Sequence, residues 1–247
     1  MIISISKISA LTQFKVKELF KNKTFLVSVL MVPAFIILYR YGFSSMMKGD
    51  GREMLLSLIL RMGTLFSTVM VSLMMPATLL AKDKEKNTLR TLMTSSVTGI
   101  DYFISCILPI LLVTIVLNLF VLIVSGVSLA TSALIQFFLA TTLSAVAASI
   151  LGMIVGIFSK NQMAASNNMV GLMMVLMMVP LFSDMIDIFE KINNFIFTGI
   201  VAKMVTGFAT GNNQPLKMTD WLVMIVSCVI FMMLFLVVYR RNGFEKE

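Results

Sequence analysis

The sequence predicts an all-α integral membrane protein with six transmembrane helices, and two observations lead to this fold class. Hydrophobic residues make up 58% of the 247 residues and charged residues only 13%, whereas soluble domains are about 45–50% apolar and about 25% charged. In addition, six apolar runs are long enough to cross a hydrocarbon layer of about 30 Å, which requires about 20 helical residues. These runs are Phe25–Tyr41, Met54–Ala81, Tyr102–Val124, Ser132–Phe158, Met163–Phe182 and Trp221–Tyr239.

The apolar runs favour helices over the strands of a membrane barrel. They lack the alternation of apolar and polar residues that such strands show, and a barrel strand needs only about 9–11 residues. We therefore expect residues 1–247 to form a single transmembrane domain. The second run is too long for one straight crossing, so part of it should tilt or project.

Residues 1–24 precede the first run and predict an amphipathic helix in the headgroup layer. Lysines are interleaved with apolar side chains there, and lysine stems can follow an apolar layer while their ammonium groups reach water. A positive flank that only orients the first span is the alternative, and the two readings are compatible. The residues expected at the interface are Lys15, Lys17, Leu19, Phe20 and Lys21.

The distribution of basic residues predicts the orientation of the chain. With six spans, both ends share one side, and that side holds 13 of the 20 lysines and arginines, against 6 on the other side. Cytoplasmic segments of membrane proteins carry the excess of basic residues. Both termini are therefore expected in the cytoplasm.

Residues 183–220, between the fifth and sixth runs, are the only sizeable segment that is not expected to span the membrane. Their mixed apolar pattern is interrupted by Gly199, Gly207 and Gly211. We expect one or two short helices that re-enter the outer leaflet, which is tolerated where protein or water satisfies the backbone. A seventh span is the alternative, and Lys203 and the glycines argue against it.

Residue patterns for catalysis or metal binding are missing from the sequence. It contains no histidine, the commonest metal ligand, and no G-x-x-x-x-G-K-[ST] phosphate loop. Cys106 and Cys228 lie in apolar runs and are read as small buried hydrophobes. Arg61 lies inside a span, where ionisable residues are functional candidates, but snorkelling to the interface is the simpler reading. We expect no catalytic residue, no metal, no bound cofactor and no nucleic-acid partner. If the chain is a transporter, a partner must supply the energy, or the chain is a passive pore.

The segment 82–101, between the second and third runs, has an unusual charge pattern. Six of its first nine residues are charged and their signs alternate. An apolar step at Leu89, Leu92 and Met93 follows, and a short helix of this kind is suited to docking in a groove of another protein. A positive flank that lies on lipid headgroups is the alternative reading.

This segment resembles the intracellular loop of ABC-2-type transporter permeases, whose pattern is roughly [ED]-[KR]-E-x-G-T-x-E-x-L-x-x-[ST]-P-[VI]. It departs from the pattern at Asn87, Arg90 and Ser96, where glycine, an acid and proline are usual; asparagine tolerates left-handed backbone better than most residues. The order of an N-terminal amphipathic helix, six spans and a half-buried outer segment also fits the family. The residues that match the loop pattern are Asp83, Lys84, Glu85, Thr88, Leu92, Ser95 and Val97.

The resemblance implies a permease subunit of an ATP-driven exporter in the cytoplasmic membrane. In such permeases the loop forms a coupling helix that docks on a separate ATPase subunit, which binds ATP and Mg²⁺. Two permeases, identical or paralogous, work with two ATPases, and the N-terminal helix lies at the membrane surface. The coupling residues so implied are Asp83, Lys84, Glu85, Lys86, Asn87, Thr88, Leu89, Arg90 and Leu92.

Two other functions remain as alternatives. A substrate-binding membrane subunit of an ATP-driven importer can also have six spans, but it usually lacks a charged loop between spans two and three. A passive channel or secondary carrier would be favoured by a buried carboxylate or a polar pore face, and neither is evident in the runs.

Two further patterns concern packing and cargo. A stripe of small residues recurs every fourth position on the fourth run, which lets helix backbones approach closely. Packing within one subunit and a dimer seam are both possible uses. The methionine-rich fifth run and the scarcity of charge in the spans favour an amphipathic peptide, drug or lipid-like cargo. The stripe consists of Ser144, Ala148, Gly152 and Gly156.

Overall fold

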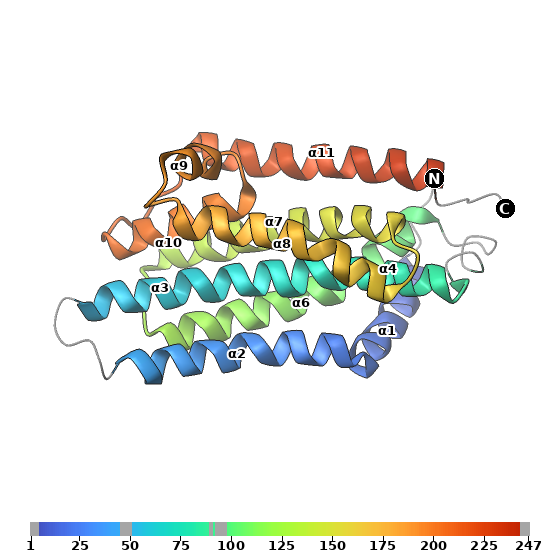
Figure 1. Ribbon diagram of the computed structural model, residues 1–247, viewed down its shortest axis with the longest axis horizontal. Coiled ribbons are helices and arrows are strands. Elements are labelled where there is room, and N and C mark those ends of the chain that lie inside the picture. Colours follow the sequence, from blue (N-terminus) through green and yellow to red (C-terminus); the bar gives the residue numbers. More distant parts are fainter. Residues whose placement is uncertain (1–4, 45–50, 89–90, 92–97, 243–247) are drawn as a thin grey trace.

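The computed structural model describes residues 5–44, 51–88, 91 and 98–242, and helices are the regular elements of these residues. The long helices run side by side, and α1 lies at one end of them at an angle (Figure 1). The elements are α1 (Ile5–Lys21), α2 (Lys23–Ser44), α3 (Gly51–Phe66), the π-helix η1 (Ser67–Leu73), α4 (Met74–Glu85), α6 (Gly99–Ser125), α7 (Thr131–Phe158), α8 (Gln162–Phe182), α9 (Asp187–Asn193), α10 (Phe197–Ala209) and α11 (Met218–Asn242).

Six segments of the described chain are long and apolar enough to cross a membrane, which confirms the predicted six transmembrane helices. The bounds agree with the expected runs to within a few residues. Because the number of spans is even, α1 and the C-terminal end of α11 lie at the same end of the bundle, here called the α1 end (Figure 1). The opposite end is called the α10 end. The spans are Lys23–Phe43, Leu55–Glu85, Ile100–Ser125, Thr131–Phe158, Gln162–Phe182 and Met218–Tyr239.

The second span is made of α3, η1 and α4 in direct succession. Its 31 residues correspond to about 46 Å of helix at 1.5 Å per residue, well above the hydrocarbon thickness. Two serine side chains of the π segment bond to α6, where Ser67 donates to Asn118 and Ser72 lies 2.7 Å from Thr114. The span therefore carries its last turn, at the end of α4, beyond the length that a membrane requires.

Helix α7 lies at the centre of the bundle and packs against this second span. An added Cβ on Gly152 would lie 2.0 Å from the Leu73 carbonyl oxygen, and one on Gly156 would lie 2.7 Å from the Ala77 carbonyl oxygen. Ser144 and the other members of the small-residue stripe are also buried. The stripe thus brings α7 close to the backbone of η1 and α4 within one chain.

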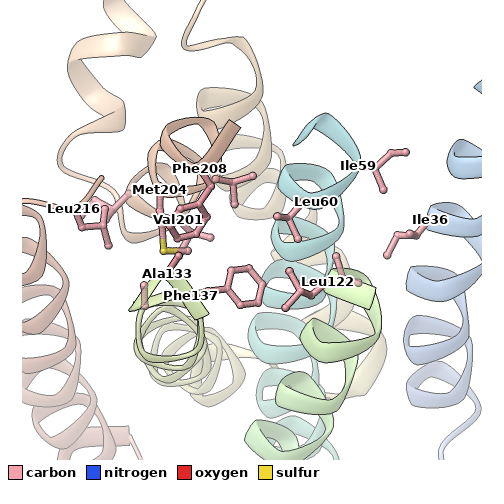
Figure 2. Packing of buried hydrophobic residues seen from close by; sticks show 14 of the residues in the cluster. Ile36, Ile59, Leu60, Leu122, Ala133, Phe137, Val201, Met204, Phe208 and Leu216 are labelled. Carbon is pink, nitrogen blue, oxygen red and sulfur yellow. The ribbon is translucent and has the colours of Figure 1, made fainter. Parts of the chain in front are cut away.

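A second packing region lies at the α10 end, where α10 is seated on α3 and α7. Phe137 projects toward Leu60 and Leu122, and Met204 lies above it (Figure 2). Each of these side chains is at most 8% exposed. This packing fixes the position of α10 among the spans.

The segment before the last span contains two short helices, as predicted. Helices α9 and α10 meet at a bend of 102°, and the 13 residues of α10 extend only about 20 Å, which is too short to cross a membrane. The Lys203 ammonium group bonds to Asp220 at 2.8 Å and ties α10 to the start of α11. Helix α10 is therefore a buried element of the bundle rather than a seventh straight span.

Candidate functional site

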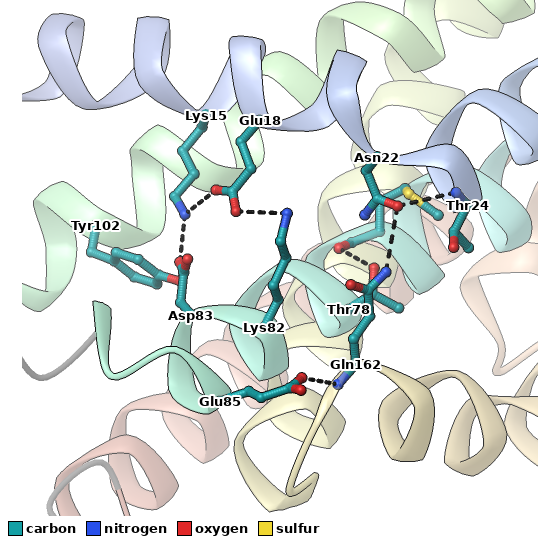
Figure 3. Close-up of polar contacts among 11 residues, drawn as sticks. Lys15, Glu18, Asn22, Thr24, Thr78, Lys82, Asp83, Glu85, Tyr102 and Gln162 are labelled. Atoms are coloured by element: carbon teal, nitrogen blue, oxygen red, sulfur yellow. Dashed lines mark hydrogen bonds and ion pairs between the residues drawn. The ribbon is translucent and has the colours of Figure 1, made fainter.

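The end of α4 is bonded to four other helices at the α1 end of the bundle. Successive residues of an α-helix point about 100° apart, so the four residues from Lys82 to Glu85 face different neighbours. Lys82 and Asp83 reach α1, Asp83 also reaches α6, and Glu85 reaches α8 (Figure 3). Lys84 reaches α7. These four residues are called the α4 hub below.

A buried ion pair joins the hub to α1. Asp83 is 2% exposed and accepts hydrogen bonds from the Lys15 ammonium group and, at 2.6 Å, from the Tyr102 hydroxyl. Lys15 is fully buried and also donates to Glu18 at 2.9 Å, while Lys82 bonds to Glu18 at 3.0 Å. Two cations and two anions therefore balance one another, as buried charges require.

Helix α1 is amphipathic in a way that serves this contact. Lys15, Leu19 and Asn22 follow one another at helical spacing and are all buried. The expectation that Lys15 reaches water is wrong, because its ammonium group points into the bundle and is paired there. Leu19 likewise packs against the bundle, whereas Lys17, Phe20 and Lys21 are exposed on the other face.

The remaining two hub residues bond to helix termini. Lys84 donates to the carbonyl of Ile157 at 3.0 Å, near the C-terminus of α7. Glu85 accepts from the backbone N–H of Gln162 at 3.2 Å, at the first residue of α8. A cation at a helix C-terminus and an anion at a helix N-terminus are the arrangements that the helix dipole favours. The hub thus holds the ends of α7 and α8 together.

The chain leaves α4 through an exposed turn. The Lys86 N–H donates to the Lys82 carbonyl at 3.0 Å, and the Asn87 N–H donates to the Lys84 carbonyl at 3.0 Å. Asn87 has a φ of 56°, in the left-handed region that asparagine tolerates, so it can stand where the loop pattern has glycine. Glu85, Lys86 and Asn87 are exposed and Thr88 is half-buried. These four residues, 85–88, are called the tip below.

The predicted coupling residues thus fall into two groups. Asp83 and Lys84 are engaged inside the chain, whereas Glu85 to Asn87 are exposed and Thr88 is half-buried. Glu85 belongs to both groups, because it is exposed and also bonds to Gln162. Leu89, Arg90 and Leu92 lie outside the described residues. A force on the tip would act directly on the hub, and through it on α1, α6, α7 and α8.

Two residues that bond within this buried cluster, Glu18 and Tyr102, were not predicted from the sequence. Glu18 is the only acid in α1, three residues after Lys15, and that spacing is the signal that could have found it. Tyr102 begins an expected span, and nothing in its local sequence predicts the bond to Asp83. Its neighbour Asp101 closes a capping box with Thr98 at the start of α6, which fixes where Tyr102 lies on that helix.

The charges of Lys15, Glu18, Lys82 and Asp83 make the packing of α1 against the bundle depend on pH. Burial raises the pKa of Glu18, but hydrogen bonds and attraction from Lys15 and Lys82 outweigh it, and the pKa lies below its ordinary value. Burial lowers the pKa of Lys15, and its bonds to Asp83 and Glu18 more than offset this, so the pKa lies above its ordinary value. Lys15 therefore stays charged throughout the neutral range.

We expect α1 to loosen in acid because of Glu18. A lowered pKa in the folded state stabilises the fold above the unfolded pKa, about 4.3 for glutamate, and this contribution is lost as the pH falls through the folded value. Amide hydrogen exchange of residues 5–21, corrected for the intrinsic effect of pH, should accelerate below about pH 4. In Glu18→Gln the acid-dependent step should shrink and exchange at neutral pH should rise; identical profiles for both proteins would contradict this role.

Comparison with known families gives one match. The family model described as ABC-2 type transporter matches residues 6–183. The matched segment runs from the start of α1 to the end of α8, so it contains the α4 hub, its partners and the tip. No curated protein matches the chain.

Proposed function

The chain belongs to the ABC-2 type transporter family and is the membrane subunit of an ABC transporter, and we propose that it is the permease of an exporter driven by a separate ATPase. The tip residues Glu85 to Asn87 carry this proposal. They are exposed and stand directly on the hub that binds four helices. An ATPase that pushes on the tip would therefore move the spans together.

The chemistry of the tip suggests how a partner would recognise it. Its side chains are an acid, a base, an amide and a hydroxyl, so a polar groove with both signs of charge fits it. Leu89 and Leu92 follow along the chain. Lys17 and Lys21 on the free face of α1 suit either the ATPase or anionic headgroups. In our proposal, ATP and Mg²⁺ are bound by the ATPase and this chain has no catalytic role.

Direction, cargo and assembly follow from the same proposal. The family resemblance supports export, and the basic excess supports a cytoplasmic-membrane protein whose α1 end faces the cytoplasm. An amphipathic peptide, drug or lipid-like cargo is supported by spans with little free charge, since Arg61 is paired within the chain. A second permease copy, identical or paralogous, would complete the unit.

We expect a Walker-type ATPase to co-purify with the chain from its native membranes in mild detergent. The variant Lys86→Glu should release it, because it reverses a charge that the exposed tip offers to the partner. Asp83 and Glu85 should not be altered in this test, since their replacement disturbs the ion pair with Lys15 and the bond to the Gln162 N–H.

The matched control reverses one charge at the opposite end of the bundle. Lys191 on α9 is exposed, and Lys191→Glu should leave the ATPase bound. If no ATPase accompanies the native chain, or if both variants release it equally, the proposed coupling site is wrong.

A further inference from the structure

Arg61 lies in the second span near the α10 end and is paired within the chain. Its side chain is 12% exposed. One guanidinium nitrogen bonds to Asp184 at 2.7 Å, and the other donates to the Ser183 hydroxyl at 3.0 Å and to the carbonyl of Pro180. Arg61 thus reaches the end of a span, as the snorkelling interpretation expects, and is paired there with residues of the same chain.

The three partners of Arg61 lie in the last turn of α8 or directly after it, at Pro180, Ser183 and Asp184. The last four carbonyls of a helix lack partners within the helix, and Arg61 supplies a donor to one of them from another span. Its positive charge also lies where the helix dipole is negative. Arg61 thus acts as a C-terminal cap for α8, provided by α3.

The same span also caps the other end of α8. Glu85 accepts from the N–H of Gln162 at 3.2 Å, which places a negative charge at the positive end of the helix dipole. The segment from Arg61 to Glu85 extends about 36 Å and the 21 residues of α8 about 31 Å, at 1.5 Å per residue. The two helices run antiparallel (Figure 1), so the lengths match and both caps are made at once.

We propose that Arg61 is a positioning residue that clamps α8 to the second span, so that the two helices move as one unit. Only 28% of the membrane-length part of α8 is buried, which makes the bonds at its ends a large share of what holds it. If the tip couples to an ATPase, displacement of the hub would then reach the α10 end through this pair. That consequence rests on the proposed function, whereas the clamp itself does not.

The clamp can be tested by pulsed spin-label distance measurements on the full chain in lipid nanodiscs, without an ATPase. Labels at Leu58 on α3 and Met178 on α8, both exposed, report the clamped pair after Cys106 and Cys228 are replaced by alanine. We expect one narrow distance distribution in the native sequence. Arg61→Gln should broaden it and add a longer-distance component.

A second pair of labels shows whether the effect is confined to the clamp. Ile135 on α7 and Leu222 on α11 are exposed, and the bonds of Arg61 described above reach neither helix. The distance distribution between these two labels should therefore stay unchanged. Arg61→Lys should give an intermediate width because it keeps the pair with Asp184. If Arg61→Gln prevents folding, Ser183→Ala/Asp184→Asn removes two of the three partners and should broaden the first pair alone.

Two results would overturn the clamp. One is an unchanged Leu58–Met178 distribution in a folded Arg61→Gln protein, and the other is equal broadening of both pairs, which indicates general loosening. Because no ATPase takes part, either result leaves the proposed coupling at the tip untouched. Conversely, an Arg61→Gln protein that still binds the ATPase but shows no ATP-dependent movement at Met178 supports both.

Discussion

Lys15→Met is expected to lower the unfolding free energy by about 3–5 kcal/mol, because it leaves a buried carboxylate without its cation. Lys15 is fully buried and Asp83 is 2% exposed. Without Lys15, the cluster keeps Glu18, Asp83 and Lys82 and carries a net negative charge inside the bundle. Thermal or denaturant unfolding in one detergent would measure the loss.

The matched control for this change is Lys17→Met. Lys17 lies two residues away on the same helix but is exposed, so an equal change of charge and volume should alter stability by less than about 0.5 kcal/mol. A similar loss in both variants would show that charge on α1, and not the buried pair, stabilises the fold.

A double variant separates the cost of an unpaired buried charge from the loss of the ion pair. Lys15→Met/Asp83→Asn is neutral again, and an asparagine oxygen can still accept the Tyr102 hydroxyl. Because replacing both partners of a buried pair is often near neutral, we expect much of the lost stability to return. If the double variant is as unstable as Lys15→Met alone, the uncompensated charge is not the cause.

The spans could be predicted from the sequence because membrane crossing depends on length and apolarity, which are local properties. The last span was expected at Trp221–Tyr239 and is observed at Met218–Tyr239. The prediction ended the second span too early, at Ala81, because charged residues follow there, whereas the observed span ends at Glu85. Its helix continues through four of them because their side chains are paired within the bundle.

The site could be predicted only in part, since its contacts join residues that are distant in the sequence. The charge pattern identified the segment that contains the hub and the tip. It did not distinguish Asp83 from Glu85, because the partner of Asp83 lies 68 residues earlier on α1. Arg61 was recognisable as an ionisable residue in a span, whereas its partners 119 to 123 residues later were not.

Gly152→Ala is the second change with a large expected effect, because the new methyl group meets backbone. Its Cβ would lie 2.0 Å from the Leu73 carbonyl oxygen, at the last residue of the π-helix. A flexible side chain could move aside, but here α7 or the second span must shift. We expect a loss of about 3 kcal/mol or more, at the upper end of what overpacking costs.

Two other glycines provide the scale for this prediction. Gly156→Ala should be milder, since its Cβ would lie 2.7 Å from the Ala77 carbonyl oxygen. Gly171 on α8 has no atom within 4 Å of an added Cβ, so Gly171→Ala should be neutral or stabilising by up to about 1 kcal/mol, because alanine favours the helix. Thermal unfolding should show the largest loss of stability in Gly152→Ala, a smaller loss in Gly156→Ala and none in Gly171→Ala.

The ranking tests more than packing, because α7 and the second span meet at Gly152 and Gly156. If Gly152→Ala were as stable as Gly171→Ala, η1 and α7 would be farther apart than the structure places them, and movement of the second span could not pass to α7 through this contact. If the ranking holds and the chain works with an ATPase as proposed, Gly152→Ala should also weaken the coupling of ATP hydrolysis to transport while leaving the ATPase bound, since the tip is unchanged and only the contact behind it is displaced.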